Sequence, residues 1–142
     1  MPISEPFDLF LGQFNLNFHS EIQQIHSLIL SLMPNGKLHF ESGVSDNGKI
    51  IHNPTLCYGE LDLPLSGGKT RKTFQIGLTS NATGLSIHVM GLRNKCSLKE
   101  LMGHNIGKAS ITGYCLRMKT INDISLEALS EGLTKAIQVQ LS

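Results

Sequence analysis

The segment from Phe74 to Leu92 constrains the fold of this chain most, because apolar and polar residues alternate on both sides of a turn within it. Apolar side chains at every second position form one face of a β-strand. The inward-facing residues predicted in this way are Phe74, Ile76, Leu78, Leu85, Ile87 and Val89. The segment therefore predicts an antiparallel hairpin with one apolar face, which a second layer of structure must cover.

Amphipathic helices are predicted near both ends of the chain. Apolar residues recur at three- and four-residue steps over 22–33, after Ser20 at the start of a capping box. Ser125 is the predicted cap of a second helix, whose buried stripe lies within 126–137. A short helix over 97–102 is predicted between the hairpin and this last helix.

Further strands are predicted at 38–44, 49–51, 61–65 and 114–118. The first two flank Asp46-Asn47-Gly48, in which the Asn-Gly pair tolerates the positive φ angles of a tight turn. Residues 66–72 are predicted as a loop rich in glycine and lysine. This order of elements predicts an α+β two-layer sandwich, with the N- and C-terminal helices on one face of an antiparallel sheet of about five to six strands.

Length and charge narrow the class of protein. The 142 residues fit one domain over 20–142, with 1–19 as an N-terminal leader that packs on it because that segment shows no regular period. A formal net charge of +1 and few aromatic residues argue against nucleic acid as a partner. Neither a signal peptide nor an apolar run long enough to cross a bilayer is seen, so we expect a cytoplasmic protein without a membrane partner.

Six short segments follow one another in a specific order. They are Thr55-Leu56-Cys57-Tyr58-Gly59, Ile76-Gly77-Leu78, Leu85-Ser86-Ile87-His88-Val89-Met90-Gly91, Leu101-Met102-Gly103-His104, Cys115-Leu116-Arg117-Met118-Lys119 and Ile121-Asn122-Asp123-Ile124-Ser125-Leu126. In this order they resemble the YdhG-like domains of bacteria, a family largely of unknown function, over roughly residues 20 to 138. The resemblance implies an α+β fold similar to that of frataxin-type iron chaperones. The chain departs from the family pattern in two places. Family members often have aromatic residues along the strand near Tyr58, where this chain has Glu60, Leu61, Asp62 and Leu63, and residues 109–112 are extra sequence in this chain.

The sheet face away from the helices is the predicted recognition surface. Its predicted ligand-binding residues are Tyr58, His88, Met90, Arg117 and Lys119. Strand parity directs His88 and Met90 away from the apolar side chains of the hairpin, although a merely solvent-facing histidine fits the same pattern. We therefore predict a non-enzymatic domain that binds a small molecule or a partner protein, without a cofactor. Apolar residues expected on this face, Met90 and Leu92, further predict a homodimer.

The alternative function is a frataxin-like intracellular chaperone that binds iron. Hard cations are held by several converging oxygen ligands, so such a site needs clustered carboxylates. The carboxylates that this alternative would use are Glu5, Asp8, Glu21, Glu60 and Asp62. Isolated surface carboxylates commonly serve only solubility, and no two histidines have the spacing of a helical metal site. On the favoured interpretation no metal ligands are predicted.

Catalytic residues are not predicted either. The loop over 66–72 contains Gly-Lys-Thr, but Leu63 stands where a phosphate-binding loop needs glycine, and a strand follows instead of a helix. Cys115 shares a strand face with Arg117 and Lys119, which can lower a thiol pKa, yet the sequence offers it no general base. The three cysteines, Cys57, Cys96 and Cys115, are expected to be reduced thiols.

Overall fold

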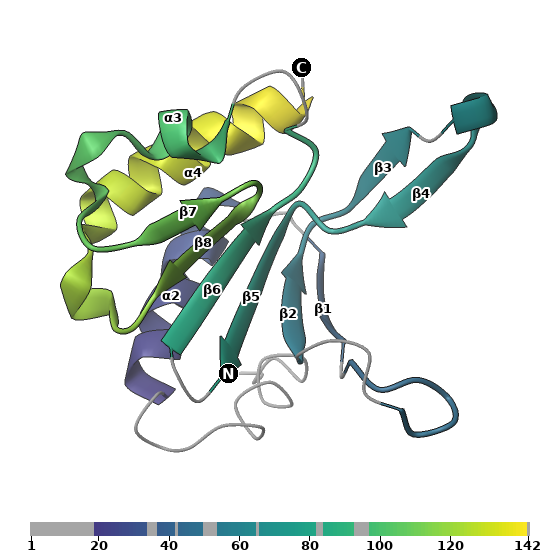
Figure 1. Ribbon diagram of the computed structural model, residues 1–142, viewed down its shortest axis with the longest axis horizontal. Helices are drawn as coiled ribbons and strands as arrows, with labels where there is room; N and C mark the ends of the chain where they lie inside the picture. Colours follow the sequence, from purple (N-terminus) through teal and green to yellow (C-terminus); the bar gives the residue numbers. More distant parts are fainter. Residues whose placement is uncertain are drawn as a thin grey trace.

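Six antiparallel strands form the main sheet, in the order β1-β2-β5-β6-β8-β7 (Figure 1). They are β1 (Leu38–Glu41), β2 (Thr55–Tyr58), β5 (Ile76–Asn81), β6 (Gly84–Val89), β7 (Ser110–Thr112) and β8 (Cys115–Met118). This computed structural model describes residues 19–33, 37–41, 43–49, 54–64, 66–81, 84–92 and 97–141. The predicted leader, except His19, and Cys96 lie outside these ranges.

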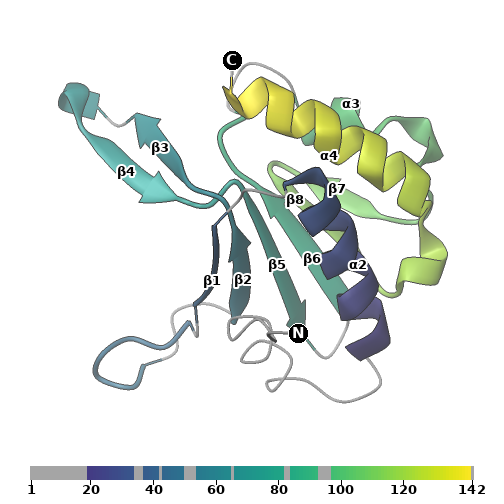
Figure 2. The same ribbon diagram turned by 180° about the vertical axis from the view of Figure 1, so that it is seen from behind.

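Helices α2 (His19–Leu32) and α4 (Leu126–Leu141) lie on the same face of this sheet (Figure 2). The buried stripe of α2 is Ile22, Ile25 and Ile29, and that of α4 is Leu129, Leu133 and Ala136. Both stripes pack on the inward side chains of the central strands, which include Leu78, Ile87 and Leu116. The predicted α+β sandwich, with its terminal helices on one face, is thus confirmed.

Serine caps start two of the helices, as their sequences predict. The hydroxyl of Ser97 accepts the N–H of Glu100 at 3.1 Å to begin α3 (Leu98–Met102), which packs on α4 beside β7. The hydroxyl of Ser125 likewise accepts the N–H of Ala128 at 3.1 Å. The predicted capping box at Ser20 is wrong, because helix α2 already includes His19.

Short one-turn helices complete the fold. They are η2 (Ser66–Gly68), η3 (His104–Ile106) and η4 (Ile121–Asp123).

None of the helices in the described ranges combines the length and the apolarity needed to cross a membrane.

A second hairpin projects away from the main sheet (Figure 1). Strands β3 (Leu61–Pro64) and β4 (Thr70–Thr73) pair antiparallel, with Asp62 opposite Lys72. The prediction of a loop over 66–72 was therefore wrong for 70–72, which lie in β4. The alternation at 61–65 did indicate β3, but the sequence does not show that this strand leaves the main sheet.

The structure differs from the other strand predictions as well. Strand β1 ends at Glu41 and pairs with β2, whereas most of the predicted strand over 49–51 lies outside the described residues. Neither β2 nor β7 was predicted as a strand. Phe74 was assigned to the inward face, but β5 begins at Ile76, and a Cβ on Gly77 would lie 2.5 Å from the Phe74 ring. The ring therefore covers Gly77 on the face opposite the helices.

A polar pair is buried within the core. Tyr58 is 2% exposed, and its hydroxyl lies 2.8 Å from Nδ1 of His26 on helix α2. Burial lowers the pKa of His26 from 6.5 to about 4 and raises the pKa of Tyr58. His26 is consequently neutral in the folded protein at neutral pH, and its protonation opposes folding.

We expect acid to destabilise the fold through His26. Between about pH 6.5 and pH 4 the unfolded chain binds a proton that the folded His26 does not, so the free energy of unfolding should fall by roughly 3 kcal/mol across this window. Denaturant unfolding of the wild type and of His26→Asn, followed by circular dichroism at pH 7 and pH 4, measures the difference. Equal losses in both proteins would contradict this role of His26, because all other titrating groups are shared.

Candidate functional site

The sheet face opposite α2 and α4 carries two cross-strand rows of polar and small residues. Strand register places Glu41, Thr55, Thr79, Ser86, Arg117 and Ser110 in the first row. The second row is His39, Cys57, Gly77, His88, Cys115 and Thr112. Among the described elements, no helix lies on this face (Figure 1). We call it the open face.

One pocket, which we call the basic pocket, has a volume of about 620 Å³ and lies where β6 begins and β8 ends. It is lined by Gly84, Leu85, Ser86, Lys108, Ala109, Ser110, Arg117, Met118, Lys119 and Asp123. The register sets Arg117 between Ser86 and Ser110. The N–H of Lys108 donates to the carbonyl of Asp123 at 2.8 Å, which fixes the segment entering β7 beside η4. Among the described residues that line this pocket, Lys108, Arg117 and Lys119 thus bring three positive charges, and Asp123 brings one carboxylate.

A second pocket, the aromatic pocket, has a volume of about 370 Å³. Its walls include Phe74, Met90 and Tyr114, and its remaining lining residues are Glu41, Thr55, Arg71, Lys72, Thr73, Thr79 and His88. His88 lies 3.5 Å from the hydroxyl of Thr79, and its ring centroid is 6.0 Å from that of Tyr114. Burial, and then the charge of Arg117, lower the pKa of His88. His88 therefore offers this pocket a neutral imidazole for hydrogen bonding.

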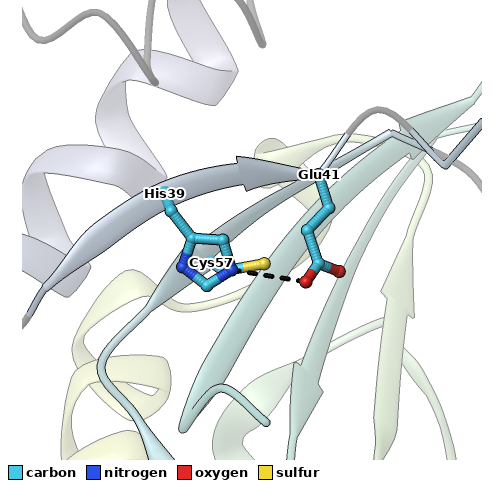
Figure 3. A group of neighbouring side chains, drawn as sticks. All are labelled: His39, Glu41 and Cys57. Carbon is cyan, nitrogen blue, oxygen red and sulfur yellow. Dashed lines mark hydrogen bonds and ion pairs between the residues drawn. The ribbon is translucent and has the colours of Figure 1, made fainter.

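His39, Glu41 and Cys57 form a third group on the open face, and their ligand atoms all lie within 4.8 Å of one another (Figure 3). His39 Nε2 and Glu41 Oε2 are 3.3 Å apart, and both side chains are about half exposed. Burial first, and then the neighbouring Glu41 carboxylate, raise the pKa of the Cys57 thiol to about 12. Cys57 is therefore a protonated thiol at neutral pH and not a nucleophile.

The predicted ligand-binding residues are divided among three places. His88 and Met90 share the aromatic pocket, and Arg117 and Lys119 share the basic pocket. Tyr58 was expected on the open face, but it is buried on the opposite face against His26. Leu92, one of the two residues behind the predicted homodimer, belongs to the hydrophobic core instead of the open face.

The carboxylates of the iron-binding alternative do not converge in the described part of the chain. Glu21 accepts hydrogen bonds from the hydroxyl of Thr120 at 2.6 Å and from the N–H of Ile121 at 2.7 Å, so it joins α2 to η4. Glu60 pairs with Lys37 at 3.6 Å, and Asp62 lies on the projecting hairpin. The remaining two, Glu5 and Asp8, lie outside the described residues.

Sequence reasoning missed the group formed by His39, Glu41 and Cys57. The alternation of Leu38, His39, Phe40 and Glu41 already places the histidine and the carboxylate on one face of a strand. The missing step was the pairing of β1 with β2, which brings Cys57 opposite His39. The pairing of β6 with β8 also sets His88 opposite Cys115. No histidine had been predicted near this cysteine.

Comparison with known protein families, curated proteins and solved structures finds no match to this chain. The resemblance to YdhG-like domains therefore stays a prediction. A proposal about function therefore depends on the geometry of the open face.

The role of Glu21 can be tested by stability. We expect Glu21→Ala to lower the free energy of unfolding by about 2 to 3 kcal/mol, because it leaves two donors without their charged acceptor. Glu60→Ala is the matched control and should cost less than about 1 kcal/mol, since its partner is an exposed lysine. Denaturant unfolding measures both values, and similar losses in the two variants would contradict a structural role for Glu21.

Proposed function

We propose that this protein is a non-enzymatic binding domain that holds a small anionic molecule in the basic pocket of the open face. The observation that carries the proposal is the charge of the pocket: among the described residues, Lys108, Arg117 and Lys119 line it together with one carboxylate, that of Asp123. Positive side chains that converge on a concave surface attract and hold anions. The volume of about 620 Å³ falls within the usual range for small-molecule sites.

The pocket also favours a particular kind of anion. The guanidinium of Arg117 presents a planar pair of donors suited to a carboxylate or phosphate, whereas Lys108 and Lys119 act as point charges. The hydroxyls of Ser86 and Ser110 flank Arg117 in the same row. Leu85, Ala109 and Met118 supply apolar surface. A compact anionic group attached to a small apolar body matches this lining best.

The competing proposal, a YdhG-like domain that chaperones iron as frataxin relatives do, draws less support from the described residues. Its carboxylates are engaged in separate contacts at Glu21 and Glu60. The sheet and its two covering helices fit either function, because a fold alone does not determine activity. The three positive side chains that line the basic pocket support the anionic ligand instead.

The test is a screen of small aromatic phosphates and carboxylates by protein-observed NMR, followed by calorimetry on the best binder. We expect the bound fragment to shift the amide signals of Ser86, Arg117 and Lys119. Arg117→Gln should weaken its Kd about tenfold, because one charge-assisted hydrogen bond contributes about 1.5 kcal/mol or more.

Lys69→Gln is the matched control, since it removes one positive charge from an exposed residue that does not line this pocket. It should leave the Kd nearly unchanged, and added salt should weaken binding in the wild type. Equal effects of the two variants, or fragments that shift only amides remote from the basic pocket, would overturn the proposed function.

A further inference from the structure

The group of His39, Glu41 and Cys57 combines three types of donor atom at one point of the open face. An imidazole nitrogen, a carboxylate oxygen and a thiol sulfur all lie within 4.8 Å of one another. Figure 3 shows His39 and Glu41 projecting from β1 toward Cys57 on β2. The usual explanation of such contacts is a half-exposed ion pair beside a buried thiol. The identity and spacing of the donors support a more specific one.

We propose that His39, Glu41 and Cys57 bind one Zn²⁺ ion. This site lies apart from the basic pocket, and the proposal does not depend on the proposed anionic ligand. It also differs from the all-carboxylate iron site considered above, both in its residues and in the kind of metal that it selects.

The distances suit tetrahedral zinc. Bonds of about 2.0 to 2.3 Å from zinc to nitrogen, oxygen and sulfur place neighbouring ligand atoms about 3.3 to 3.8 Å apart. The separation of His39 Nε2 and Glu41 Oε2, 3.3 Å, already lies in this range. The widest separation in the group, at most 4.8 Å, must close by roughly 1 to 1.5 Å, which half-exposed side chains can do by small rotations.

The donor set selects the metal. Thiolate and imidazole favour zinc and similar ions of borderline softness, whereas magnesium and calcium prefer oxygen ligands alone. Three protein ligands leave the fourth tetrahedral position to water or another small ligand. On binding, the Cys57 thiol forms its bond to the metal and releases its proton to solvent.

Backbone pairing holds the donors before any metal arrives. His39 and Cys57 are directly opposed in the antiparallel pair of β1 and β2, and Glu41 follows two residues later on the same face. Cys57 is fully buried between Leu56 and Tyr58, which belong to the core. The sulfur is therefore fixed by the sheet, and only the two β1 side chains need to adjust.

Cobalt(II) titration of the untagged, reduced and chelator-treated protein tests the site, because Co²⁺ reports thiolate ligation and tetrahedral geometry by its absorption. We expect one equivalent of Co²⁺ to produce a sulfur-to-cobalt charge-transfer band and strong visible bands, which one equivalent of Zn²⁺ then removes. Zn²⁺ should also raise the thermal unfolding midpoint, since it binds the folded state.

Matched variants assign the ligands. Cys57→Ser should abolish the charge-transfer band, whereas Cys115→Ser, which alters the other described buried cysteine, should retain it. His39→Ala should weaken Zn²⁺ binding more than about 100-fold, because loss of a ligand exceeds the usual effect of losing a supporting contact. His88→Ala is its control on the same face. His39 is half exposed, so this variant keeps the test valid even if Cys57→Ser fails to fold.

Several results would overturn the zinc site. The first is a wild-type protein that shows no charge-transfer band with stoichiometric Co²⁺. The second is a band that survives Cys57→Ser in a folded protein, which would assign the sulfur to another cysteine. The third is an equal loss of Zn²⁺ affinity in His39→Ala and His88→Ala.

Discussion

The burial of one sheet face beneath α2 and α4 is the constraint on which the rest of the structure depends. Fully buried side chains such as Ile25, Leu78 and Leu133 join the two layers, and burying one such side chain contributes about 1.5 to 3 kcal/mol of hydrophobic stabilisation. Because side chains alternate along a strand, fixing the inward set also fixes the outward set. A slip of one residue in register would expose the apolar core side chains and bury the polar rows of the open face. The packing of the opposite face therefore determines where both proposed sites lie.

The open face differs in character from one edge of the sheet to the other. Toward β8 and β7 it presents the cations of the basic pocket, whereas at β1 and β2 it presents nitrogen, oxygen and sulfur ligands. Phe74 covers Gly77 on β5 between these two regions. A larger residue at Gly77 would displace the ring, so the glycine and the aromatic wall depend on one another. One sheet face thus presents cations near one edge and nitrogen, oxygen and sulfur donor atoms near the other.

The sequence could predict those parts of the fold that depend on local pattern. Alternation along the β5–β6 hairpin predicted which of its faces is covered and that His88 points outward. Ser97 and Ser125 predicted helix starts because their own side chains make the capping hydrogen bonds. Tyr58 could not be assigned in this way, because all four residues of β2 are buried and the strand shows no alternation. The prediction for Phe74 was wrong for a related reason. Strand β5 begins two residues later, so the alternation of its side chains does not extend to the Phe74 ring.

Long-range pairing was beyond local pattern, and it is this pairing that assembles both sites. His39 and Cys57 are separated by 17 intervening residues, and only the register of β1 on β2 brings them together. Arg117 likewise gains Ser110 as a neighbour only through β7, a three-residue strand too short to show a period. Neighbouring strands lie about 4.8 Å apart, so the β1–β2 edge and β8 are separated by roughly 15 Å. That distance exceeds the Debye length of about 8 Å at physiological salt, so the charge of a bound cation at one edge would be largely screened at the other. Such a cation would act mainly on its own surroundings, by joining the edge strand β1 to β2 through side chains as well as through backbone hydrogen bonds.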